Sequence, residues 1–348
     1  MERLLDLSTQ LLRGIVHPFM STQERPWRRT ILEATERFLT WRKMRKHRKA
    51  EKQRQKNVVV DWIEAFIWAA FVVLLVNQYL LQAYQIPSGS MIDTLRQQDR
   101  IFVNKVVYGP ELIPGMIKLP GFATPRRAEV IIFENPSYIG KGPLFDILQR
   151  VIYMLTLSMV DIDRDEQGMP RAHFLIKRAV GAEGDQIRLR FGNVEIKPQG
   201  SARWYDEEEF KEYASKEYPV RRIIDRPDYA TFTLAGRASA LRDAGLSVTE
   251  AEAEAISEVS QMGFIDPFAL EQSRTATLYQ IDPSSERVRR RFNSLENGYY
   301  VPRGRLFPMG DNRDNSRDAR YFGAVSKEKV LGRAMFIYWP LNRFGAIR

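Results

Sequence analysis

The sequence predicts a mainly β protein that follows an N-terminal transmembrane helix and carries an inserted subdomain with some helix. Three observations predict this fold class. An apolar run follows a basic leader, several short segments are rich in β-branched and aromatic residues, and a later stretch is rich in charged residues and alanine. With 348 residues, 44% of them hydrophobic, the chain is long enough for two or three units with a sizeable core.

The excess positive charge is confined to the leader. The formal net charge is +10, and residues 1–57 hold 15 Lys and Arg against 6 Asp and Glu. The rest of the chain holds 38 basic and 37 acidic residues. A nucleic-acid-binding domain usually carries its excess charge on the folded body. We therefore expect no nucleic-acid partner, and a nucleic-acid patch on the leader is the competing interpretation.

The apolar run from Trp62 to Leu81 predicts a membrane anchor. Twenty helical residues span about 30 Å, the thickness of the hydrocarbon core of a bilayer. No charged residue occurs from Ala65 to Ile92. A buried core helix is the alternative, because the fully apolar stretch Ala65–Val76 is shorter than a span. The flanking sequences favour the membrane.

The direction of the anchor follows from the segment Arg42–Lys56, which contains nine Lys and Arg and one acidic residue. Such a block stays on the cytoplasmic side of a membrane span. The chain from Tyr84 onward is then on the exported side. The run lies too far from the N-terminus for an ordinary cleaved signal peptide. We expect an uncleaved signal anchor in the cytoplasmic (inner) membrane, with a single pass and with the lipid bilayer as a partner.

The exported part begins with strand patterns. Strands are predicted at Arg100–Val107 and at Val130–Phe133, and a strand, turn and strand at Phe174–Ile187. A final strand is predicted at Lys329–Trp339.

Other segments favour helices or turns. Leu144–Val160 is a mainly apolar helix candidate, and both a core position and a membrane-interface position remain open. Asp161–Gly168 superficially resembles a calcium loop, but its glycine and its twelfth position do not fit, which favours a solvated turn. From Ser201 to Asn297 the chain is rich in charge and alanine, with helical patterns at Glu207–Ser215 and Arg237–Met262.

The composition restricts the chemistry. Cysteine is absent, which excludes disulfides, cysteine nucleophiles and thiolate zinc sites. The three histidines are His17, His47 and His173, so a multi-histidine metal site is nearly excluded, and we expect no metal and no cofactor. Only His173 follows the predicted span. A serine nucleophile on the exported side would therefore need His173 or a lysine as its base, and a Ser-Lys pair is a recognised variant.

Four ordered motifs point to a family. Ser88-Gly-Ser90-Met91 lies just beyond the predicted span, followed by Asp99-Arg100, Lys177-Arg178 and the segment GDNRDNSRDAR at 310–320. This arrangement resembles the bacterial type I signal peptidases, also called leader peptidases, over residues 59–200 and 297–348. The sequence departs from the family pattern at Asp93, where proline is usual, and at Ala319, where serine is usual. The stretch between Ser90 and Lys177 is also longer than usual.

The resemblance implies a role for each matching residue. Ser90 corresponds to the nucleophile and Lys177 to its general base. The hydroxyl of Ser88 and the backbone amide of Ser90 correspond to the oxyanion hole, and Ser316 to the serine that orients the lysine amine. The supporting residues are Asp318 and Arg320, as a salt-bridged pair, and Arg178 as their neighbour.

Two of these residues also have non-catalytic interpretations. Ser88 could be a turn residue, and Lys177 could be a surface lysine at a strand end. Three carboxylates in the last motif could also suggest a metal cluster, but interleaved arginines favour salt bridges. These carboxylates are Asp311, Asp314 and Asp318, and the arginines are Arg313, Arg317 and Arg320.

The resemblance also implies a substrate class. Members of the family cleave signal peptides with small residues at the first and third positions before the cut, as in Ala-x-Ala. An extended substrate would pair beside Gln82–Pro87 by β-augmentation. Small pockets for its side chains would be lined by Ile86, Pro87, Met91, Leu95 and Ile176.

The family fold is mostly β, with two antiparallel sheet regions that form a catalytic core and a larger cap. The expected domains are a basic cytoplasmic segment at 1–57, the signal anchor at 58–82, the first part of the core at 83–200, an inserted cap at 201–296 and the second part of the core at 297–348. The cap looks more helical than the family implies.

The sequence thus predicts a membrane-anchored serine endopeptidase that removes signal peptides from exported preproteins with a Ser-Lys dyad. Its partners are signal-peptide-bearing preproteins and lipid, and proximity to the export translocon is compatible with this placement. Two rivals remain. One is a self-cleaving repressor, which would need a DNA-binding domain and no membrane anchor. The other is a membrane-tethered binding protein without catalytic activity. Loss of Ser90 or Lys177 would favour it, but both residues are present.

Overall fold

The structure is a computed structural model. It describes residues 26–54, 58–113, 117–138, 140–142, 144–146, 148–149, 152, 162–164, 171 and 173–347. The chain divides into two units, Met1–Ala70 and Phe71–Arg348. Most of Leu144–Val160 and of Asp161–Gly168 lies outside the described residues, so the predictions for these two segments are not tested as a whole.

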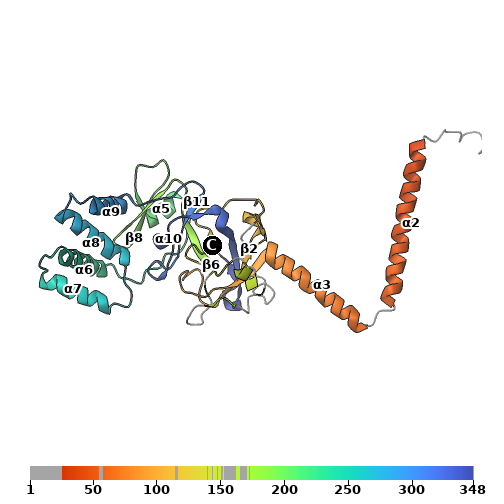
Figure 1. The fold of residues 1–348 in the computed structure, drawn as a ribbon, viewed down its shortest axis with the longest axis horizontal. Coiled ribbons are helices and arrows are strands. Elements are labelled where there is room, and N and C mark those ends of the chain that lie inside the picture. The colour runs from red at the N-terminus through yellow and green to blue at the C-terminus, as the bar shows by residue number, and fades with distance from the viewer. Residues whose placement is uncertain are drawn as a thin grey trace, which may run out of the picture. The chain divides into compact units, whose positions relative to one another are not determined.

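Two long helices, α2 (Pro26–Arg54) and α3 (Val58–Tyr79), precede the sheets along the chain (Figure 1). Within the described residues, α3 is the one helix that is long and apolar enough to cross a membrane, with a mean hydropathy of 2.2 in its most apolar window. None of that window is buried against protein. Its acidic residues, Asp61 and Glu64, lie near its start, and it ends before the first strand.

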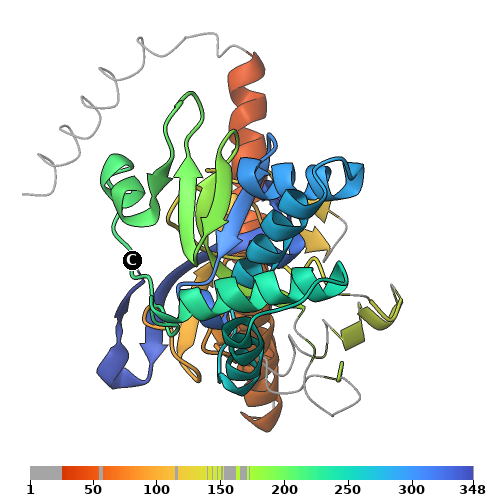
Figure 2. The same ribbon diagram turned by 90° about the vertical axis from the view of Figure 1, so that its left-hand side faces the viewer.

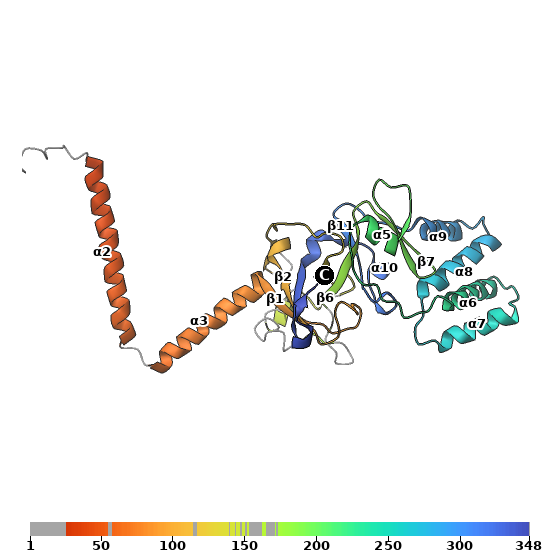
Figure 3. The ribbon, with the colours of Figure 1, turned by 180° about the vertical axis from the view of Figure 1, so that it is seen from behind.

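An antiparallel eight-stranded sheet forms the centre of the second unit (Figures 1 and 3). Its order is β1-β2-β13-β5-β6-β11-β12, and β14 also pairs with β13. The strands are β1 (Leu81–Gln85), β2 (Arg100–Asn104), β5 (Val130–Glu134), β6 (Phe174–Ala182), β11 (Arg305–Met309), β12 (Val325–Ser326), β13 (Val330–Trp339) and β14 (Gly345–Ala346). The late strand β13 therefore lies between two early ones, β2 and β5.

A four-stranded sheet, a two-stranded sheet and several short helices complete the β part of the second unit. A second sheet has the order β10-β7-β8-β9, and β3 pairs with β4. The strands are β3 (Glu111–Ile113), β4 (Ile117–Lys118), β7 (Gln186–Arg190), β8 (Asn193–Lys197), β9 (Tyr205–Asp206) and β10 (Tyr299–Tyr300). The short helices are α5 (Glu207–Tyr213), α10 (Ala319–Phe322), and the 3-10 turns η1 (Val106–Tyr108), η2 (Arg313–Asn315), η3 (Lys327–Lys329) and η4 (Leu341–Arg343).

Four helices between β9 and β10 form a bundle beside the second sheet (Figures 1 and 2). They are α6 (Asp228–Asp243), α7 (Glu250–Gln261), α8 (Pro267–Ile281) and α9 (Glu286–Asn297). Thr249 begins α7 with a capping box to Glu252, and Asp266 caps the first turn of α8. At Gly236 a Cβ atom would lie 2.5 Å from the Leu270 carbonyl oxygen, so glycine allows α6 and α8 to pack closely.

The bundle has its own apolar core, which includes Phe232, Ala255 and Val259. It is joined to the second sheet by polar contacts. The side chain of Gln272 donates to the Leu189 carbonyl, and Arg190 forms an ion pair of 2.6 Å with Glu296.

The fold class predicted from the sequence is confirmed, and the predicted strands are present with small shifts at their ends. The helix expected at Arg237–Met262 is wrong in its extent, because the chain forms two helices separated by a turn at Ala244–Gly245. Gly245 has a φ of +70°, a conformation that ends α6. Helices α8 and α9 were not predicted at all. Asp163 is fully buried among charged partners, so this residue does not fit the expected solvated turn.

Candidate active site

Ser90 lies in the turn that follows β1, and the turn is fixed from both sides. Its neighbours Met91 and Leu95 are buried in the apolar cluster that also contains Ile101 of β2. Burial of one such side chain contributes about 1.5–3 kcal/mol. On the other side, the backbone amide of Asn312 donates to the Ser90 carbonyl at 3.1 Å, and the Asn312 side chain donates to the Gly89 carbonyl at 3.1 Å.

Lys177 is brought to Ser90 by the main sheet. It lies on β6, opposite Ile131 of β5, and its side chain is 4% exposed. Its Nζ atom lies 2.6 Å from Ser90 Oγ and also donates to its neighbour, the Ile176 carbonyl, at 3.1 Å. The two residues are 87 positions apart in the chain, so only the folded sheet creates this contact.

The environment of Lys177 favours the neutral amine. Burial lowers the pKa of Lys177 to about 8, because the charged form loses its hydration. The nearby carboxylates of Asp318 and Asp311 oppose this change, and the guanidinium of Arg320 adds to it. A buried lysine with a pKa near neutrality, hydrogen-bonded to a serine hydroxyl, has the chemistry of a general base with its nucleophile.

The loop from Gly310 to Ser316 packs directly against Ser90. A Cβ atom at Gly310 would lie 2.5 Å from the Ser90 carbonyl oxygen and 2.2 Å from Ser316 Oγ. Glycine is therefore required at this position for the loop to approach. In the part of the chain that the structure describes, Lys177 Nζ bonds to Ser90 and Ile176 and not to Ser316, so the orienting role of Ser316 stays a prediction.

Ser88 lies close to Ser90. Its Oγ donates to Ser90 Oγ over 3.4 Å, a long hydrogen bond, and its side chain is exposed to an incoming substrate. A hydroxyl in this position is free to turn toward a negative charge that develops beside Ser90.

Asp318 and Arg320 form a buried ion pair in α10 and its cap. Arg320 Nε lies 2.9 Å from Asp318 Oδ1, and Asp318 Oδ2 accepts the Gly310 amide at 2.9 Å. Burial raises the pKa of the Asp318 carboxyl, but the charge and hydrogen bonds of Arg320 outweigh it, so the pKa lies below its ordinary value. The pair thus stays charged and holds the loop that carries Gly310.

Arg178 is also fully buried, and its partner is one that the sequence did not reveal. Two of its nitrogens bond to the Asp311 carboxylate at 2.8 and 2.7 Å, and it also donates to Thr94 Oγ1 at 3.0 Å. Asp311, Thr94 and Asn312 are therefore supporting residues that sequence reasoning missed. The only signal for Asp311 and Asn312 was their position inside the 310–320 motif.

Comparison with known proteins matches this arrangement to one family. The family model described as "Signal peptidase, peptidase S26" matches residues 59–339. The chain belongs to this signal peptidase family. It is a serine peptidase, a hydrolase.

Curated relatives agree with the family. The chain is 25% identical over 302 residues to signal peptidase I of Pseudomonas fluorescens, covering 83% of this chain and 76% of the relative. It is 26% identical over 309 residues to signal peptidase I of Haemophilus influenzae, covering 84% and 74%. It is 26% identical over 269 residues to signal peptidase I of Aquifex aeolicus, covering 77% and 79%.

The residues expected to line substrate pockets of this peptidase are not equally accessible. Ile86, Met91 and Leu95 are buried in one apolar cluster, and Ile176 is half-buried against it. Pro87 is exposed. Their role in substrate binding stays a prediction.

His173 of the peptidase lies elsewhere. Its Nε2 is 3.2 Å from Asp163 and its ring centroid is 4.2 Å from that of Tyr138. The hydrogen bonds of the Ser90 hydroxyl go to Lys177 and Ser88, so His173 does not contact the serine.

The three carboxylates of the 310–320 motif each pair with an arginine. The pair of Asp318 with Arg320 is the expected one, but Asp311 and Asp314 pair with arginines outside the motif. Asp311 pairs with Arg178, Asp314 with Arg222 and Asp318 with Arg320. Among the described residues, no group of three acidic or histidine side chains could hold a metal ion.

The segment before α6 connects the bundle to the site of the peptidase. Arg221 forms a parallel β-bridge with Asn312, and its backbone amide donates to the Asp311 carbonyl at 2.8 Å. The Arg221 side chain forms an ion pair of 3.2 Å with Asp93. Asp314 accepts the amides of Ile223 and Ile224 at 2.6 and 2.9 Å. Asp93, the departure from the family pattern, thus contacts the inserted segment.

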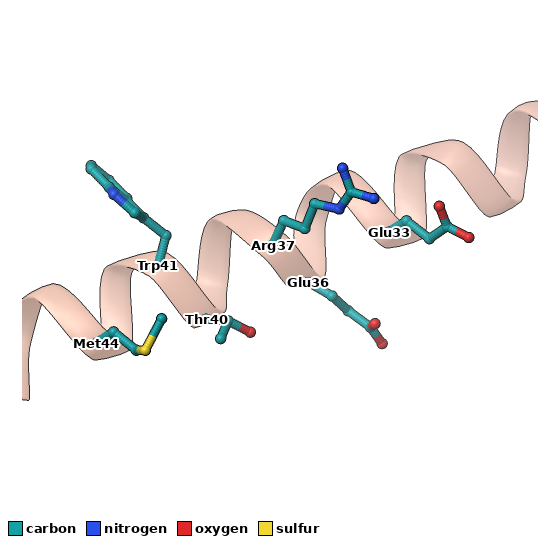
Figure 4. A pocket seen from close by; sticks show the side chains of 6 residues that line it. All are labelled: Glu33, Glu36, Arg37, Thr40, Trp41 and Met44. Atoms are coloured by element: carbon teal, nitrogen blue, oxygen red, sulfur yellow. The ribbon is translucent and has the colours of Figure 1, made fainter.

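Two of the hollows among the described residues lie outside this site. One, of about 410 Å³, is lined by side chains of α2 alone, so a single helix bounds it and it cannot enclose a substrate (Figure 4). The other, of about 350 Å³, lies between the β7–β8 hairpin, the start of α5 and the start of α6, and Arg222 and Tyr229 line it. Neither includes Ser90 or Lys177.

Proposed function

We propose that this serine peptidase is anchored in the membrane and removes signal peptides from exported preproteins, with Ser90 as nucleophile and Lys177 as general base. The observation that carries the proposal is the 2.6 Å contact between Lys177 Nζ and Ser90 Oγ in a buried site where the pKa of the lysine is about 8. Signal peptidase I relatives supply the substrate class.

The proposed reaction has two halves. Neutral Lys177 takes the proton of the Ser90 hydroxyl as its oxygen attacks the scissile carbonyl carbon. The Ser90 amide and the Ser88 hydroxyl stabilise the negative oxygen, typically by about 3 kcal/mol for each donor. The lysine ammonium then gives its proton to the leaving amine, and an acyl-enzyme remains. In the second half, Lys177 takes a proton from water as the water attacks the ester carbonyl, and then returns this proton to Ser90 Oγ as the ester bond breaks, which releases the signal peptide with a new C-terminal carboxylate.

The sheet edge offers a place for the substrate. β1 is the edge strand of the eight-stranded sheet and leads directly to Ser90. An extended peptide can add to this edge by backbone hydrogen bonds. A long hydrogen bond of 3.4 Å from the Ala83 amide to Asn77 would have to give way. Selection of small residues, as in Ala-x-Ala, is part of the proposal and follows from the buried, crowded surroundings of Met91 and Leu95.

The proposed anchor is α3, with the N-terminus in the cytoplasm and the sheets on the exported side of the cytoplasmic membrane. Its 22 residues extend about 33 Å at 1.5 Å per residue, enough for a bilayer core. The basic segment Arg42–Lys56 precedes it, which favours this orientation.

The test is cleavage of a purified preprotein in detergent. Ser90→Ala and Lys177→Ala should each lower kcat by at least about 1,000-fold, and the double variant should be scarcely worse, because the two residues act as one unit. His173→Ala, the matched control, should keep most of the activity. A folded Lys177→Ala protein that is active beside an inactive His173→Ala protein would overturn the mechanism.

A further inference from the structure

The helix α2 carries an apolar stripe of exposed large side chains. Ile31, Ala34, Phe38 and Trp41 follow one another at spacings of three and four, so they lie on one face of the helix. Ile31, Phe38 and Trp41 are 56%, 57% and 52% exposed. A row of exposed large apolar side chains marks an interaction surface.

Basic residues continue the same stripe. Arg45 lies four positions after Trp41, and its guanidinium is 4.9 Å from the centre of the indole ring. Arg42 and Arg48 flank it on the same side by helical spacing. One face of α2 therefore runs from apolar and aromatic to positively charged.

The acidic residues of α2 lie on the other side. By the same spacing, Glu33, Glu36 and Glu51 fall away from the stripe. Figure 4 shows Trp41 and Glu36 pointing to opposite sides of the helix. The stripe thus carries no acidic residue, so it suits a negatively charged, partly apolar partner. Other basic and apolar residues of α2, such as Lys43 and Leu39, lie on its other faces.

We propose that α2 lies along the membrane surface, with Ile31, Phe38 and Trp41 in the boundary between headgroups and acyl chains and Arg42, Arg45 and Arg48 on anionic phospholipid headgroups. A stripe of aromatic and apolar side chains with adjacent arginines is the pattern of an interfacial helix. The inference rests on the proposed span, because α3 begins four residues after α2 ends and brings the bilayer to this helix.

Other partners fit the stripe less well. A nucleic acid would use the arginines but leave the apolar residues exposed to water. A second copy packed in parallel on the stripe would bring Arg45 and Arg48 against the same residues of its partner, which like charges oppose. Anionic lipid satisfies both parts of the face at once.

The absence of cysteine from the sequence allows a direct test. Phe38→Cys, Glu36→Cys and Phe66→Cys each give one site for a spin label in the full chain, reconstituted in phosphatidylcholine vesicles with or without phosphatidylglycerol. The accessibility of the spin label to oxygen and to a water-soluble nickel reagent reports how deeply the label lies in the bilayer. The nickel reagent is present on both sides of the membrane. Preprotein cleavage confirms that each labelled protein is folded.

In anionic vesicles we expect the label at 38 to be immersed and the label at 36, the matched control on the opposite face, to be in water. Changing Arg42, Arg45 and Arg48 to Glu should lower the ratio of immersed to free label at 38 by at least about fivefold for each arginine, as about 1 kcal/mol per basic residue at an anionic surface requires.

Four outcomes would overturn the proposal. They are water exposure of the label at 38, equal immersion with and without phosphatidylglycerol, exclusion of both reagents at 38 as in a protein contact, and movement of the label at 38 from the bilayer into water when a single-stranded oligonucleotide is added. The label at 66 separates the two proposals. If it is immersed while the label at 38 is not, only the inference on α2 fails; if it is in water, the proposed span fails.

Discussion

A single buried amine determines how the site should respond to pH. In the proposed mechanism Lys177 must be neutral to accept the serine proton, and burial lowers its pKa to about 8. Below that pH the ammonium form dominates and cannot act as a base.

We therefore expect kcat/KM to rise with pH through an apparent pKa of about 8, well below the value of about 10.4 for a free lysine. The measurement is a pH profile of preprotein cleavage in detergent, with His173→Ala as the control that should keep the same limb. A limb near 6.5 that disappears in His173→Ala would assign the titration to the histidine.

The buried pair of Arg178 and Asp311 should be important for stability. Arg178→Met leaves the Asp311 carboxylate buried without its partner, and we expect the free energy of unfolding to fall by about 3–5 kcal/mol. Urea unfolding followed by tryptophan fluorescence measures the change.

The matched control is Arg203→Met, because Arg203 and Glu209 form a similar pair with side chains 65% and 47% exposed. Its loss should change stability by less than about 1 kcal/mol. Arg178→Met/Asp311→Leu should recover part of the lost stability. Equal effects of the two single variants would contradict the view that burial makes the Arg178 pair important.

For single residues, the sequence predicts which residues belong to the candidate site more readily than which side chains form ion pairs with each other. Ser90 and Lys177 stand in short motifs, and the structure brings the two predicted site residues within 2.6 Å of each other, while their catalytic roles stay a prediction. The partner of Arg178 was not predicted, because Asp311 lies 133 positions away and only the pairing of β6 with β11 brings the two together. Local charge patterns in 310–320 favoured arginines of the same segment, and the fold selected Arg178 and Arg222 instead for Asp311 and Asp314.

Among the larger elements, the loop before α10 has the strictest geometric requirement. Gly310→Ala would place a Cβ atom 2.5 Å from the Ser90 carbonyl oxygen, so the turn that carries Ser90 or the loop must move. A displacement of about 1 Å can cost about 100-fold in rate. We expect kcat to fall by about that factor, with the thermal midpoint changed little.

Steady-state kinetics beside a thermal melt measures this effect. Gly263→Ala is the control, because a Cβ atom there would meet nothing within 4 Å. Wild-type kcat in Gly310→Ala would show that the loop can yield without moving Ser90.

Elements were predictable where a local pattern decides them. The strands β5 and β6 have runs of apolar and β-branched residues, and both were found. α8 and α9 were missed although local signals mark them. Asp266 and Pro267 begin α8, and Val288, Phe292 and Leu295 share one face of α9. Only their contacts with α6 and β7 depend on the tertiary fold. The parallel bridge between Arg221 and Asn312 is likewise a product of the tertiary fold.

For the whole molecule, the basic leader and the charge-free helix α3 lead to a prediction about topology. Protease added to the outside of right-side-out spheroplasts should digest residues 84–348 and leave residues 1–57 protected, because positive segments remain in the cytoplasm. Antibodies to each end, with lysed spheroplasts as the control, measure the fragments. Protection of the sheets with loss of the leader would reverse the proposed orientation.

The position of β13 has a consequence for the timing of proteolysis. Ser90 precedes β2 and Lys177 lies on β6, while the strand that joins these two halves of the sheet comes from residues 330–339. During synthesis, Ser90 and Lys177 therefore emerge before the strand that joins their halves of the sheet. If the two residues act as proposed, we expect the growing chain to cleave neither its neighbours nor its own apolar anchor until β13 completes the sheet.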